Sequence, residues 1–111
     1  LLDTALPAAE LGAVNAVLDR HARDAGAQFH ALRTREAGAR RFVSVHILVP
    51  GRWTVQRGHR LLEAVERDIR AAVPGMIVFT HLESLDDPAS WDDTSLDRAD
   101  AALDVPQGRL V

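Results

Sequence analysis

The stretch Arg41–Val49, R-F-V-S-V-H-I-L-V, decides the fold of this chain. Every second residue in it is branched and aliphatic, so in an extended strand these residues share one face: Val43, Val45, Ile47 and Val49. The residues between them belong to the opposite face: Phe42, Ser44, His46 and Leu48. Pro50-Gly51 then ends the strand. We therefore expect a central strand with its valine face in the core and a histidine on the other side.

The flanking stretches predict two helices and two more strands. Before the central strand, a helix is expected from Pro7 to Ala25, where Gly26 stops it, and then a strand from Ala27 to Arg35. After it, Thr54 is suited to cap a helix that Pro74-Gly75 ends, and Met76–Glu83 reads as a third strand. The apolar stripe expected along the second helix is Val55, Leu62, Val65, Ile69 and Val73.

The predicted order is α-β-β-α-β, an α+β two-layer sandwich of the ferredoxin-like, metallochaperone-like kind. The domain should cover residues 1–91, with 92–111 as an acidic and flexible segment that contains a short possible helix near Leu96–Leu103. Trp91 is a candidate anchor that packs back onto the domain. The sheet face away from the helices would carry Phe42, His46, Leu48, and Phe79 or Thr80. Such a face favours a partner surface, often a second copy of the chain.

The composition excludes several classes of function. The 111 residues are 47% hydrophobic and 26% charged, with a formal charge of −3 and interspersed basic residues, so no nucleic-acid partner is expected. With no cysteine, a disulfide framework, a thiolate metal site and a thiol nucleophile are all excluded. No apolar run approaches the length of a membrane span, so we expect no insertion of this segment into a membrane.

The histidines form the clearest candidate site. His30, His46 and His81 fall one on each predicted strand. His81 and Glu83 are two residues apart, so their side chains point to the same side, separated by about 6.6 Å along the strand. Imidazole nitrogens and a carboxylate oxygen suit zinc and its first-row neighbours. The alternative is that these histidines simply form hydrogen bonds.

The two helix histidines have simpler interpretations. His21 lies beside the apolar stripe of the first helix and is expected to pack or cap there. His59 stands one turn before Glu63, which is typical of a solvated ion pair. No nucleophile elbow, phosphate-binding loop or H-E-x-x-H motif is present, so nothing in the sequence favours an enzyme.

Several segments together resemble the C-terminal cytoplasmic domain of the cation diffusion facilitator family of metal transporters. F-H-A-L-R-T-R-E-A-G (29–38) is similar to the family's H-x-L-R-T-R-x-x-G segment, and R-F-V-S-V-H-I-L-V-P-G (41–51) to its central strand. H-R-L-L-E-A-V-E (59–66) is similar to its helix with a leading histidine, and T-H-L-E (80–83) to its strand-end H-x-[DE]. L-L-D-T-A-L-P (1–7) is similar to the linker that follows the last membrane helix, and the collinear match covers residues 1–91.

The resemblance implies a cytoplasmic homodimer that binds divalent cations, zinc first among them, and regulates the membrane domain of the same transporter. Residue by residue, it implies metal ligands at His30, His46, His59, His81 and Glu83, while His21 matches no family position. Glu83 stands where some members have Asp, and Ser84 where a proline often follows.

Three other readings stay open at this point. The chain could be a dimerisation module without metal dependence, a stand-alone soluble metal carrier or, last, an enzyme that uses a hydrolytic metal. The start at Leu1, just after the position of a membrane helix in the family, favours a domain excised from a full transporter.

Overall fold

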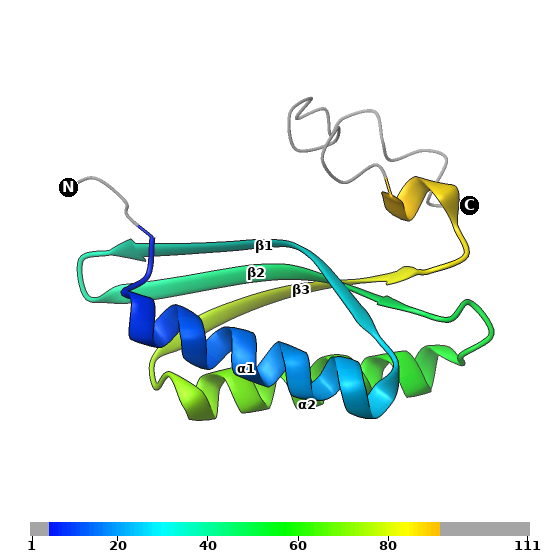
Figure 1. Cartoon of the computed structure of the whole chain (residues 1–111), viewed down its shortest axis with the longest axis horizontal. Coiled ribbons are helices and arrows are strands. Elements are labelled where there is room, and N and C mark those ends of the chain that lie inside the picture. Colours follow the sequence, from blue (N-terminus) through cyan, green and yellow to red (C-terminus); the bar gives the residue numbers. More distant parts are fainter. Residues whose placement is uncertain (1–4, 92–111) are drawn as a thin grey trace.

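The computed structural model describes residues 5–91, and these residues form two layers. The chain order is α1 (Ala8–Ala25), β1 (Gln28–Ala37), β2 (Arg40–Val49), α2 (Val55–Ala72), β3 (Met76–Ser84) and a short 3₁₀ helix, η1 (Pro88–Trp91). Both α-helices lie against one face of the sheet, whereas η1 lies on the opposite side (Figure 1). The predicted α-β-β-α-β sandwich is therefore confirmed. The segment 92–111, with its predicted short helix, lies outside the described residues.

Local signals fix the ends of the elements. Gly26 closes α1 with a left-handed φ of 74°, and Gly38 has a φ of 64° in the β1–β2 turn. Thr54 caps α2 as predicted, because its hydroxyl accepts a hydrogen bond of 3.0 Å from the backbone N–H of Arg57. No helix in the described part of the chain is long and apolar enough to cross a membrane.

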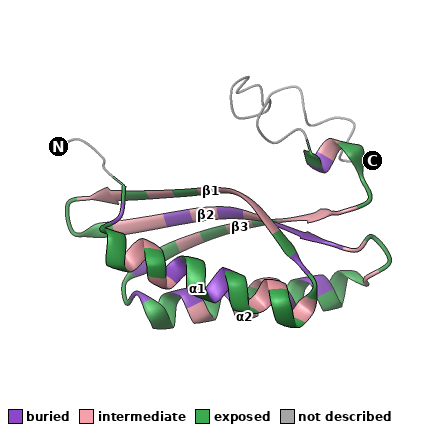
Figure 2. Ribbon diagram, viewed as in Figure 1, coloured by how far each residue is buried: buried purple, intermediate pink, exposed green. Residues whose placement is uncertain are grey.

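The sheet order is β1-β2-β3, with β1 antiparallel and β3 parallel to the central strand β2. The predicted valine face of β2 is buried beneath the helices, together with residues of α1 and α2 (Figure 2). Thr80 donates a hydrogen bond to Glu66 of α2, so it faces the helices, and Phe79 takes the open face. Leu48 also belongs to the open side, yet it is fully buried there, outside the main core cluster.

One predicted core position on α2 is wrong. Val55 is 85% exposed, and the buried stripe is instead made of Gly58, Leu61, Val65 and Ile69. The helix first meets the sheet at Gly58, where an added Cβ would come within 2.6 Å of a methyl carbon of Leu82. Val55 precedes this contact by almost one turn, so no part of the sheet covers it.

Polar contacts join the two helices on their outer side. The Nε2 atom of His21 lies 2.8 Å from an Oδ2 atom of Asp68 to which Arg20 donates a hydrogen bond of 3.0 Å. The His21 side chain is 15% exposed, so the predicted packing role of this residue is confirmed. The hydrogen bond with His21, followed by that with Arg20, lowers the pKa of Asp68 from its ordinary value.

The lowered pKa of Asp68 predicts a pH-dependent contribution to stability. A depressed carboxyl pKa stabilises the fold above the unfolded-state value of about 3.9, and the contribution is lost as the pH falls through the lower folded value. Asp68→Asn should therefore reduce the free energy of unfolding in urea by about 1 kcal/mol at pH 7, and the difference should shrink below about pH 3.9. The exposed Asp19→Asn serves as the control and should change stability little at either pH. A deficit of Asp68→Asn that is the same at pH 7 and pH 3 would contradict the ionic origin.

Candidate metal centre

A row of three histidines crosses the open face of the sheet. In the strand register His30 pairs with His46, and His46 pairs with His81, so each strand contributes one member. A β-bulge follows His30 in β1, where Ala31 adopts a positive φ of 55° and the register shifts before Arg33. The prediction that His46 turns away from the valine face is therefore confirmed.

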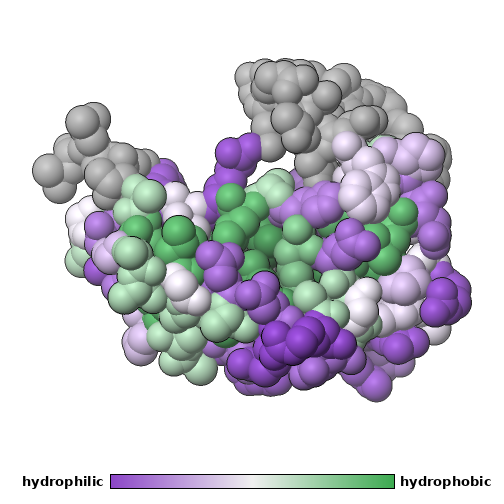
Figure 3. All heavy atoms as spheres, viewed as in Figure 1, coloured by the Kyte–Doolittle hydropathy of each residue, from purple (hydrophilic) through white to green (hydrophobic). Residues whose placement is uncertain are grey.

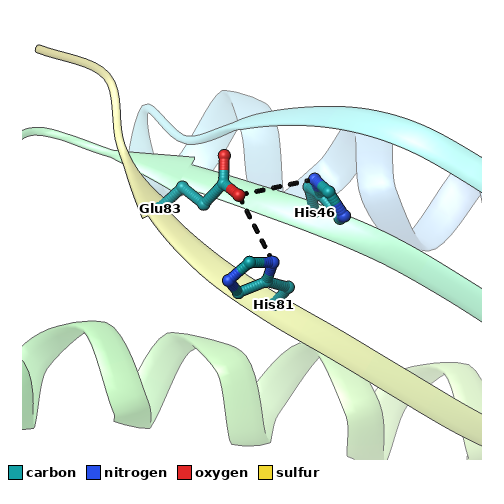
Figure 4. Close-up of side chains that lie close together, drawn as sticks. All are labelled: His46, His81 and Glu83. Carbon is teal, nitrogen blue, oxygen red and sulfur yellow. Dashed lines mark ion pairs between the residues drawn. The ribbon is translucent and has the colours of Figure 1, made fainter. Parts of the chain in front are cut away.

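His46, His81 and Glu83 converge on one point of this face (Figure 4). The Glu83 Oε2 atom lies 3.3 Å from Nδ1 of His81 and 3.7 Å from Nδ1 of His46. Each residue offers one ligand atom, and the three atoms lie within 4.8 Å of one another. Two imidazole nitrogens and one carboxylate oxygen form a donor set that suits zinc and its first-row neighbours.

The electrostatics of the cluster centre on Glu83. Its side chain is only 6% exposed, compared with 24% for His46 and 56% for His81. Within the described part of the chain, neither carboxylate oxygen accepts a hydrogen bond. Burying a carboxylate without donors is costly, whereas a cation held between the carboxylate and the imidazoles would offset that cost. The site thus has the chemistry of a cation site that is open on the His81 side.

The other two predicted ligands lie outside this cluster. His30 belongs to the same row, but its ring packs edge-on against Trp91, with ring centroids 4.7 Å apart. This contact, with a hydrogen bond from Trp91 to the Leu85 carbonyl, supports the predicted anchoring of Trp91. His59 lies on α2 and is 61% exposed, with its Nε2 atom 3.2 Å from Glu63. Within one chain, therefore, His59 forms the predicted solvated pair with Glu63.

A groove beside Glu83 was not predicted. It has a volume of about 190 Å³ and runs between the β2–α2 connection and the end of β3, with Trp53, Val55 and Leu82 in its lining. The Trp53 ring also stacks under the guanidinium of Arg57 at 4.0 Å. No local pattern could have revealed this groove, because its walls come from segments about 30 residues apart.

Comparisons with known proteins agree with this architecture. Residues 6–85 match the family model described as "Cation efflux protein, cytoplasmic domain". An uncharacterised transporter of Synechocystis, sll1263, is 50% identical over 91 residues, which are 82% of this chain and 29% of that protein. The cation-efflux pump FieF of Pectobacterium atrosepticum is 33% identical over 81 residues, which are 73% of this chain and 26% of the pump.

The solved structure of CzrB in its zinc form has the same fold. It is 34% identical, covers 76% of this chain and 94% of its own, and superimposes with a TM-score of 0.66. The chain spans less than a third of the length of the two transporters named above.

Proposed function

Because the chain belongs to the family of cation efflux protein cytoplasmic domains, we propose that it senses a divalent cation and regulates the membrane domain of its transporter. His46, His81 and Glu83 would hold the ion, and zinc is the ion proposed first. The observation that carries this proposal is the buried Glu83 carboxylate, which faces two imidazoles and accepts no hydrogen bond from the described residues. The zinc form of CzrB, with a similar fold, supports the choice of zinc.

Three protein ligands leave at least one coordination position of a tetrahedral ion open. We propose that a second copy of the chain lies next to this position, so that the ion stabilises a homodimer. His30, in the same histidine row, and His59, on the exposed face of α2, are the remaining proposed ligands. His59 does not join the three-residue cluster of its own chain, so its role would require the partner copy.

The regulatory step would be a shift of the population from separated copies to a closed dimer. Without the cation, two copies that each present a buried carboxylate at the sheet face repel one another when they approach. A bound cation removes this repulsion and binds the closed dimer better than the separated copies, so it shifts the equilibrium toward closure. In a full transporter, closure would favour one arrangement of the attached membrane domain.

Calorimetric titration of zinc into the chain at pH 7.5 tests this proposal. We expect heat of binding for the wild type and strongly reduced heat for His81→Ala, because this change removes a ligand from the cluster. His21→Ala is the control, since His21 packs against Asp68 on the helix side. Absence of binding heat in the wild type would overturn the proposal, as would binding that His81→Ala leaves unchanged.

Binding should also depend on pH. A protonated imidazole cannot ligate a metal, and free imidazole titrates near pH 6.5. Zinc affinity should therefore fall steeply between about pH 7.5 and pH 5.5. Fluorescence competition with a chelator of known pH dependence measures this. An affinity that stays constant over this interval would show that the imidazoles are not ligands.

A metal-independent dimerisation module is the second candidate function. The exposure of Phe79 at 58% and Ile77 at 37% on the open face favours it. Sedimentation velocity with zinc and with a chelator separates the two candidates. The sensing proposal predicts that zinc increases the dimer fraction, whereas the dimerisation module predicts the same dimer fraction in both conditions.

A further inference from the structure

The β-bulge that follows His30 in β1 has a backbone conformation that alanine rarely adopts. Ala31 has a φ of 55°, and no other residue in the described part of the chain, glycine aside, has a positive φ. In this left-handed conformation the Cβ atom of an L-residue lies too close to the following carbonyl oxygen, whereas glycine, which lacks Cβ, adopts it freely. Such a backbone persists only where the surrounding structure fixes it, so the position calls for an explanation.

The bulge reverses which residues of β1 face the helices. In a regular strand, residues three apart in sequence point to opposite faces of the sheet. Phe29 and Leu32 are three apart, yet both pack against the core cluster beneath the helices. The alternation of β1 is therefore shifted by one residue between these two positions.

The same shift keeps His30 on the open face. His30 pairs with His46, and Arg33 pairs with Ser44, which are both residues of the open face of β2. Between these two pairs β1 has two residues, whereas β2 has only Val45. If β1 were regular and kept its register from Arg33 onward, His30 would turn toward the helix layer.

The hairpin turn decides which part of β1 would shift without the bulge. Five consecutive pairs, from Arg33↔Ser44 to Ala37↔Arg40, lead into the turn that contains Gly38. Only three pairs, from Gln28 to His30, lie on the other side of the bulge. The turn fixes the register of the longer part, so loss of the bulge would move the shorter part, which includes His30.

We propose that the left-handed backbone at Ala31 positions His30 beside the candidate metal centre. The bulge supplies the one extra residue that keeps the His30 imidazole on the open face, in the same row as His46 and His81. Ala31 is itself a positioning residue, because its methyl group offers no ligand atom. The part of this inference that concerns zinc rests on the proposed function, whereas the placement of the His30 ring does not.

Nuclear Overhauser effects between the rings of His30 and Trp91 test the placement without metal, because the ring centroids lie 4.7 Å apart. In the full chain in chelator, we expect these effects in the wild type and in Ala31→Gly. They should disappear in Ala31→Val, because a β-branched residue resists a positive φ. Ala37→Val is the matched control, since Ala37 belongs to the same strand but has no positive φ, and it should keep them.

Effects of wild-type strength in a folded Ala31→Val would overturn the proposal. The amide signals of α2 report whether this variant is folded. If it is not, Ala31→Leu, which is not branched at Cβ, takes its place. We expect weakened ring effects in that variant, and undiminished effects would overturn the proposal in the same way.

A double-mutant cycle with zinc tests whether Ala31 acts through His30. We expect Ala31→Val to lower zinc affinity by roughly 10-fold, as the loss of an outer partner of a metal ligand does. His30→Ala/Ala31→Val should then bind zinc no more weakly than His30→Ala alone. Losses that simply add would overturn the positioning role. Absence of zinc binding in the wild type would refute the proposed function alone, because the ring effects decide the placement of His30 without zinc.

Discussion

Glu83→Gln should abolish most zinc binding while leaving the metal-free fold intact. The substitution keeps the size of the side chain but removes the negative charge that faces His46 and His81. Under the proposed function we expect zinc affinity to fall by roughly 100-fold or more, because replacing even an outer partner of a metal ligand costs 10- to 100-fold. Isothermal calorimetry at pH 8 measures the change.

Glu83→Gln should increase the stability of the metal-free chain. In the metal-free chain the buried Glu83 carboxylate accepts no hydrogen bond from the described residues, so its desolvation is not offset there. Gln removes this desolvated charge, and we expect the free energy of unfolding in chelator to rise by about 1 kcal/mol. A residue that weakens the fold by itself and strengthens it with an ion is characteristic of a binding site rather than of a structural ion pair.

Glu63→Gln is the matched control. Glu63 also pairs with a histidine, but its side chain is 60% exposed on α2. The same chemical change should leave the metal-free stability of the chain within about 0.5 kcal/mol of the wild type. If Glu83→Gln instead destabilised the metal-free chain and left zinc affinity unchanged, Glu83 would be a structural residue and the proposed site would be wrong.

The parts of the fold that follow from short periodic patterns could be predicted from the sequence. The alternation of Val43, Val45 and Ile47 identified the core face, because the period of two belongs to the strand itself. Val55 has the right residue type and spacing for α2, but its burial depends on where the helix meets the sheet. Leu48 is fully buried although the alternation places it on the open side, where η1 also lies (Figure 1), and this burial does not follow from the period of two.

The candidate site also has one part that local spacing predicts and one part that it does not. His81 and Glu83 share a side because they are two residues apart, which the sequence shows directly. Their approach to His46 depends on the parallel register of β2 and β3, and no local pattern specifies that register. Which hydrophobic side chains reach the surface is also set by how the layers pack. Figure 3 shows such side chains gathered between the sheet and the helices on the face turned to the viewer.

Ile47→Ala should produce the largest loss of stability of the substitutions considered. Ile47 is 0% exposed in the central strand, directly after His46 of the candidate site. We expect the free energy of unfolding to fall by about 2–5 kcal/mol, from lost burial and the cavity left behind. Ile77→Ala, the same change at a site that is 37% exposed, should cost much less. Equal losses would mean that the core is not centred on β2. Urea unfolding in chelator measures both variants.

Zinc should restore part of the stability that Ile47→Ala removes, because an ion that binds the folded chain alone stabilises it by mass action. At a free zinc concentration 100 times the dissociation constant, the gain is about 2.7 kcal/mol. This gain should be the same in the wild type and in Ile47→Ala, since Ile47 faces the helices and not the cluster. In Ile47→Ala/Glu83→Gln the gain should fall to about 0.4 kcal/mol or less at the same zinc concentration, because the affinity is lower by roughly 100-fold or more. A gain that stays near about 2.7 kcal/mol in the double variant would place the stabilising ion elsewhere on the chain.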